Sequence, residues 1–73
     1  MSGAWQTTSV YGLWSIRVGR WVATVWASAA GGYLWEVEHL DGEPGSGVVG
    51  PVADAERARR AALAWARQRL TPG

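Results

Sequence analysis

Two neighbouring stretches of the chain have the residue pattern of β-strands. In LWSIRV, residues 13–18, Trp, Ile and Val occupy every second position, which is the period of a β-strand. The next stretch, WVATVWA at residues 21–27, is rich in β-branched and aromatic residues, as strands are. Only Gly19 and Arg20 separate the two stretches, and a two-residue loop that begins with glycine is typical of a type II′ hairpin turn.

This turn fixes which residues of the two predicted strands lie opposite each other. Six apolar residues fall on one face of the hairpin, in the pairs Val18 with Trp21, Ile16 with Ala23, and Trp14 with Val25. Because side chains alternate along a strand, a slip of one residue would exchange the two faces. The register therefore decides which tryptophans enter the core.

A third alternating stretch, YLWEVEHL, begins at Tyr33. We expect Trp35 and Val37 to lie beside Val25 on the apolar face, which requires a connecting loop with an odd number of residues. The three residues 30–32, which end in two glycines, are the predicted loop.

The C-terminal part of the chain predicts a short fourth strand and one helix. VVGPV, residues 48–52, is the strand, and its proline favours the edge of a sheet. Asp54 is expected to cap a helix that runs from about Ala55 to Leu70. Alanines line one side of this helix, with Trp65 as the single large side chain.

The predicted fold class is therefore α+β: a three- or four-stranded antiparallel β-meander with one C-terminal α-helix packed on one face. Residues 1–9 are predicted to form a loose N-terminal arm, and residues 10–73 a single domain. Four tryptophans are expected to be buried between helix and sheet, namely Trp14, Trp21, Trp35 and Trp65.

One helix covers only one face of a sheet, so the opposite face must meet solvent or another molecule. The apolar residues predicted there are Tyr11, Leu13, Val22, Trp26 and Leu34, flanked by the charged residues Arg17, Glu36 and Glu38. Aromatic residues together with arginine are typical of the centres of protein interfaces. The alternative is that the N-terminal arm folds back through Trp5 and covers this face.

Composition narrows the chemistry that the chain can perform. Its 73 residues contain six tryptophans and no cysteine, which excludes disulfides and thiolate metal sites. The net charge is only +1, but it is unevenly distributed along the chain. Four acidic residues lie within residues 36–43, and five arginines lie within residues 54–70.

Those arginines give the second hypothesis. Arg57, Arg60 and Arg67 lie on the polar side of the predicted helix and are candidate contacts to nucleic-acid phosphates. The alternative is an ordinary solvated helix face. We favour the solvated face, because the pI of about 8.4 lies below the value of about 9 that is typical of nucleic-acid-binding domains.

Catalytic and metal-binding patterns are weak. His39 is the only histidine, and together with Asp41 and Glu43 it matches none of the strong zinc spacings. Glu36 and Glu38 would lie about 7 Å apart on one strand face, but a single small sheet offers no deep cleft around them. We predict no enzymatic activity, no catalytic residue, no metal site and no cofactor.

The sequence thus predicts a small non-enzymatic protein-binding module, an adaptor, subunit or inhibitor of the kind that phages and mobile elements encode. Its partner is expected to be another protein or a second copy of the chain, as a homodimer. The alternative partner is nucleic acid, bound through the Trp/Arg face of the sheet or through the arginine-rich helix. The N-terminus does not resemble a signal peptide, and no apolar run reaches the ~18–20 residues of a membrane span. We therefore expect a cytoplasmic protein with no membrane partner.

Overall fold

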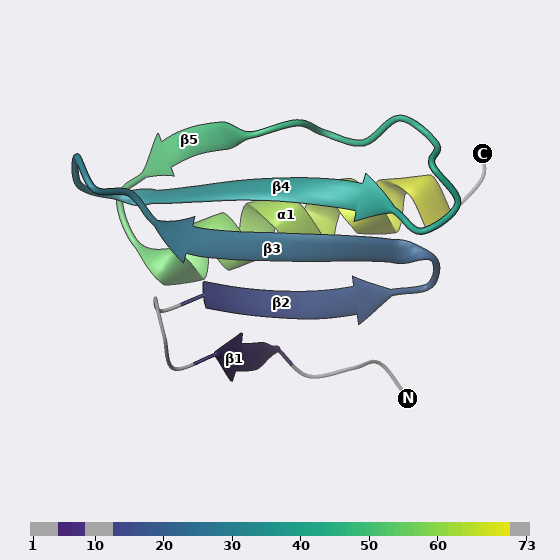
Figure 1. The fold of residues 1–73 in the computed structure, drawn as a ribbon, viewed down its shortest axis with the longest axis horizontal. Helices are drawn as coiled ribbons and strands as arrows, with labels where there is room; N and C mark the ends of the chain where they lie inside the picture. Colours follow the sequence, from purple (N-terminus) through teal and green to yellow (C-terminus); the bar gives the residue numbers. More distant parts are fainter. Residues whose placement is uncertain (1–4, 9–12, 71–73) are drawn as a thin grey trace.

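The computed structural model of the chain describes residues 5–8 and 13–70. It shows an antiparallel sheet with one helix lying across one of its faces (Figure 1). The elements are β1 (Gln6–Thr8), β2 (Leu13–Val18), β3 (Trp21–Ala27), β4 (Tyr33–His39), β5 (Val49–Val52) and α1 (Ala55–Leu70). The strands lie in the sheet in the same order as in the chain, so the predicted α+β meander with a C-terminal helix is confirmed.

The register of β2 and β3 is the predicted one. Trp14 lies opposite Val25, Ile16 opposite Ala23, and Val18 opposite Trp21. Gly19 has a φ of 62°, and among the described residues only glycines have a positive φ. A positive φ at the first turn residue alone is the requirement of a type II′ turn.

The connection between β3 and β4 differs in length from the prediction. Pairing ends at Ala27 and Tyr33, so the loop contains residues 28–32 rather than 30–32. Two backbone hydrogen bonds close the loop: the Ser28 N–H donates to the Gly32 carbonyl at 2.9 Å, and the Gly31 N–H donates to the Ser28 carbonyl at 3.1 Å. An odd number of loop residues preserves the alternation, so Trp35 and Val37 share the core face with Val25 as predicted. The pairing itself is shifted by two residues: Val25 lies opposite Trp35, whereas a loop of residues 30–32 would have placed it opposite Val37.

The sheet has five strands, where the sequence predicted three or four. The additional strand is β1, which lies within the segment predicted to be a loose arm and pairs antiparallel with β2. This pairing occupies backbone groups along the edge of β2 that would otherwise need water. At the opposite edge β5 pairs with β4, and the Gly50–Pro51 peptide bond within it is cis.

Helix α1 begins and ends at the predicted residues. The Asp54 side chain caps it, because its Oδ1 accepts a hydrogen bond of 2.8 Å from the N–H of Arg57. The Asp54 carbonyl accepts a further bond of 3.2 Å from the N–H of Ala58. The predicted helix cap is therefore confirmed.

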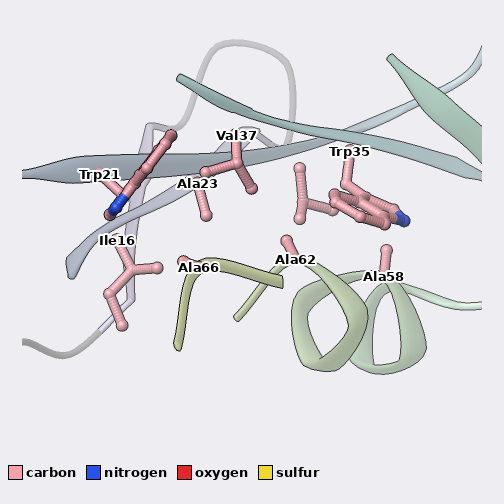
Figure 2. Packing of buried hydrophobic residues seen from close by; sticks show 9 residues of the cluster. Ile16, Trp21, Ala23, Trp35, Val37, Ala58, Ala62 and Ala66 are labelled. Atoms are coloured by element: carbon pink, nitrogen blue, oxygen red, sulfur yellow. The ribbon is translucent and has the colours of Figure 1, made fainter. Parts of the chain in front are cut away.

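A row of alanine methyl groups joins α1 to the sheet. Ala58, Ala62 and Ala66 each have an exposed fraction of 0%, and they recur at intervals of one helical turn. Opposite them on the sheet lie the buried residues Ile16, Trp21, Ala23, Val25, Trp35 and Val37. Figure 2 shows that the large indole rings lie at the two ends of this layer and the small side chains between them.

Two of the four tryptophans predicted to be buried are only partly buried. Trp21 and Trp35 are 6% and 7% exposed, as predicted, whereas Trp14 and Trp65 pack at the margin of the core. Trp65 precedes Ala66 by one residue, about 100° around the helix, so it is turned away from the alanine row. Its ring contacts the edge of Trp21, with 5.3 Å between centroids.

The alanine row makes a prediction about stability. Ala62→Leu should lower the free energy of unfolding by about 1–3 kcal/mol, because the larger side chain would force the helix away from the sheet. The matched control is Ala64→Leu, since Ala64 is exposed on the same helix and should change stability by less than about 0.5 kcal/mol. Urea denaturation measures both, and equal midpoints for the two variants would contradict this packing.

Candidate functional site

The face of the sheet that points away from α1 is the candidate site, and we call it the outer face. In Figure 1 the helix lies behind the sheet, and no described segment crosses in front of the central strands. Its residues alternate with those of the core along three strands: Leu13, Ser15 and Arg17 of β2, Val22, Thr24 and Trp26 of β3, and Leu34, Glu36 and Glu38 of β4.

Strand pairing arranges these residues in rows that run across the sheet. Arg17 is paired with Val22, and Val22 with Glu38, so the charged residues lie at opposite ends of one row. The two ends are about 10 Å apart, since neighbouring strands are separated by about 4.8 Å. At the other end of the strands, Trp26 is paired with Leu34. The outer face therefore has a charged end and an apolar end.

The apolar end contains a shallow depression. Leu13, Thr24, Trp26, Ala27 and Glu36 line a hollow of about 490 Å³. The side chains of Leu13 and Trp26 are partly exposed there. An aromatic ring beside a shallow apolar hollow gives a partner both a contact surface and a recess.

Among residues 5–8 and 13–70, the charges of the outer face have no counter-ion. Arg17, Glu36 and Glu38 form no ion pair with any residue in the described part of the chain. The Nε of Arg17 donates to the carbonyl of Gly19 at 3.2 Å. The pairing of these carboxylates with Arg17 across the sheet, which their positions would allow, is not formed.

Trp5 lies on the helix side of the sheet. Trp5 packs against the core cluster, and it lines a hollow of about 200 Å³ together with Glu56, Arg59, Arg60 and Leu63. The alternative that Trp5 covers the outer face is therefore wrong. Tyr11, which was predicted to belong to the outer face, lies outside the described residues.

The helix arginines predicted as phosphate contacts are exposed, and Arg57 and Arg60 each lie beside a carboxylate. Arg60 lies 2.8 Å from Glu56, and Arg57 lies 3.7 Å from Asp54. These pairs are solvent-exposed and contribute little to stability, but the carboxylates reduce the positive potential around the arginines. Arg67 lies further along the same helix.

A charged contact that sequence reasoning missed ties the β2–β3 turn to the end of β4. The Arg20 guanidinium donates two hydrogen bonds to the Asp41 carboxylate, one of them 2.7 Å from Nη2 to Oδ1. Arg20 lowers the pKa of Asp41 in this way, and the carboxylate raises the pKa of Arg20. The two residues are 21 positions apart, so no local pattern indicates the contact.

His39 takes part in this turn through its ring. Its Nδ1 accepts a hydrogen bond of 3.0 Å from the N–H of Asp41, and its ring meets the edge of Trp21. Across the described ranges, no three His, Asp or Glu side chains lie close enough together to hold a metal ion. These two contacts, with the N–H of Asp41 and with the Trp21 ring, hold the His39 side chain at the end of β4.

A second hollow, which the sequence did not indicate, lies beside β4. Its volume is about 450 Å³, and its lining includes Glu36, Glu38, His39 and Glu43. Ser46 holds the segment after β4 against that strand, because its Oγ accepts a hydrogen bond of 2.7 Å from the N–H of Val37. The hollow is acidic and shares two carboxylates with the charged end of the outer face.

No family model, curated protein sequence or solved structure matches this chain. In the part of the chain that the structure describes, no helix has the length and apolar character that crossing a bilayer requires.

The Arg20–Asp41 contact predicts a pH dependence. The pKa of Asp41 is lowered in the folded state, so its contribution to stability is present above the ordinary aspartate pKa of about 3.9 and is lost as the pH falls through the folded value. Arg20→Gln should return the pKa of Asp41 toward its ordinary range and remove that acid-dependent component. Carboxyl NMR titration measures the shift.

Arg17→Gln is the matched control for this titration, because Arg17 forms no ion pair within the described residues. It should leave the pKa of Asp41 unchanged. An Asp41 that titrates at the same pH in the parent and in the Arg20→Gln variant would refute the contact.

Proposed function

We propose that this chain is a small non-enzymatic protein-binding module that acts through its outer face, as an adaptor, a subunit or an inhibitor. The observation that carries the proposal is that Leu13, Trp26 and Leu34 lie beside the charged residues of the same face, with no described segment over them. The partner is a protein, which includes a second copy of the chain. The cytoplasmic location expected from the sequence stays a prediction.

The energetic argument depends on Trp26. A tryptophan at the centre of an interface typically contributes about 2 kcal/mol or more to binding, which corresponds to a ~30-fold change in affinity. Thr24 and Glu36 adjoin it, and their polar groups can pair with a partner at the margin of the apolar contact. A surface with an aromatic centre and a polar surround has the anatomy of a protein interface.

The charge of the outer face favours a protein partner over nucleic acid. Surfaces that stack the bases of single strands combine aromatic residues with a positive groove, whereas Glu36 and Glu38 give the outer face two carboxylates beside one arginine. The carboxylates would repel phosphate and attract basic groups of a protein. On α1, Arg57 and Arg60 adjoin carboxylates of their own chain. Nucleic acid therefore stays the alternative, and the geometry does not favour it.

Site-specific photo-crosslinking tests the proposal. A photoreactive amino acid is placed at Thr24, in the centre of the outer face, and the chain is expressed in cells of its source. We expect protein adducts that fall by at least about tenfold with Trp26→Ser, while circular dichroism shows the fold to be unchanged. The triple variant Arg57→Gln, Arg60→Gln, Arg67→Gln should leave these adducts intact.

Two controls fix the interpretation. The same photoreactive residue at Ala64, exposed on α1, should give few adducts, and Val48→Ser, which removes an exposed apolar side chain outside the outer face, should not reduce those at Thr24. Adducts that form only at Ala64, or that are digested by nuclease, would contradict a protein-binding outer face.

A further inference from the structure

We infer that the occupant of the outer face is a second copy of this chain, packed face to face about a two-fold axis parallel to β3. The inference rests on the proposed function, because it uses the same surface. It adds the identity of the partner and the geometry of the contact.

The first step is the position of the charges. Arg17 and Glu38 lie in one row, on the two strands that flank β3, with Val22 between them. A two-fold axis parallel to β3, midway between two facing sheets, places β2 of one copy over β4 of the other. The rotation does not change the position of any residue along the strand direction. Arg17 of each copy then faces Glu38 of the other, and the contact occurs twice, as in every isologous interface.

The same rotation brings the apolar ends together. Trp26 lies on the central strand, so it meets Trp26 of the other copy close to the axis. Leu13 lies on β2 and Leu34 on β4, so each faces the other across the interface. Apolar groups thus meet apolar groups at one end of the face, and Arg17 meets Glu38 at the other. In the row between them, Glu36 of each copy faces Ser15 of the other, whose hydroxyl can donate to the carboxylate.

The other two-fold axis in the plane of the interface does not achieve this. An axis perpendicular to the strands would place each strand over the same strand of the other copy, running in the opposite direction. Arg17 would then lie over the apolar end near Leu13, and Trp26 would lie over the row of Val22. The distribution of residues therefore favours one arrangement, and aligned packing of two sheets about 10 Å apart is a common form of sheet contact.

The size of the surface sets the expected strength. Three strands of six or seven residues present a face of roughly 15 by 20 Å, which is smaller than the ~800 Å² that each partner buries in a standard interface. We therefore expect a dimer that dissociates on dilution, and not an obligate one.

Charge-reversal variants test the inference. Analytical ultracentrifugation of the purified chain over a range of concentrations measures the dimer association constant of each variant. Arg17→Glu places like charges opposite each other at both contacts, and so does Glu38→Arg. Each variant alone should lose at least about tenfold in the dimer association constant. An equimolar mixture of the two variants should dimerise again, because each Arg17→Glu copy can face a Glu38→Arg copy and both contacts then join opposite charges.

Further variants guard against loss of folding and unrelated charge effects. Arg17→Glu and Glu38→Arg combined in one chain should restore the homodimer, since the two charges are then exchanged at both contacts. Glu43→Arg makes the same charge change as Glu38→Arg at an exposed residue outside the face, and it should leave dimerisation unchanged. Circular dichroism verifies that every variant is folded.

Three results would overturn the inference: a parent chain that stays monomeric up to millimolar concentration, single variants that still dimerise, or a mixture that stays monomeric. The proposed function would survive each of these if photo-crosslinks from Thr24 join the chain to a different protein in a Trp26-dependent manner. A loss of all protein crosslinks would reject the proposed function itself.

Discussion

The contact of three alanine methyl groups with the inner face of the sheet is the interaction on which the rest of the structure depends. Ala58, Ala62 and Ala66 are fully buried, and their small size lets the helix lie close to the strands while Trp21 and Trp35 fill the two ends (Figure 2). This helix is about 24 Å long, and it covers only one face of the sheet. The contact that completes the core therefore also determines which face stays uncovered.

Arginine side chains pack on tryptophan rings on one side of the sheet only, among the described residues. On the helix side, the guanidinium of Arg59 lies 5.2 Å from the ring of Trp14, and that of Arg69 lies 4.3 Å from the ring of Trp65. These cations shield the half-buried rings and are attracted to their faces. Within the described residues no cation covers Trp26. The chain thus protects its aromatic surface on one side and leaves it available on the other.

The sequence predicted most of what depends on local periodicity. The face of each strand residue followed from alternation and from the turn at Gly19, and the start of the helix followed from Asp54. The short strand β1 was missed because three residues are too few to show a period. The depth of Trp65 and the side on which Trp5 packs depend on tertiary contacts, so neither could be predicted. Because Trp5 packs on the helix side, no residue within 5–8 and 13–70 folds over the outer face.

The order of the strands in the sheet has a consequence for biosynthesis. Each strand pairs with the one that precedes it in the chain, so the sheet can grow as the chain leaves the ribosome, whereas α1 follows only after the last strand. At translation rates of about 5–20 residues per second, the 16 residues of α1 take roughly one to three seconds to appear. During that interval the apolar inner face of the growing sheet, which α1 later covers, is exposed in addition to the outer face. The nascent chain is then more prone to aggregation and to capture by chaperones than the finished protein.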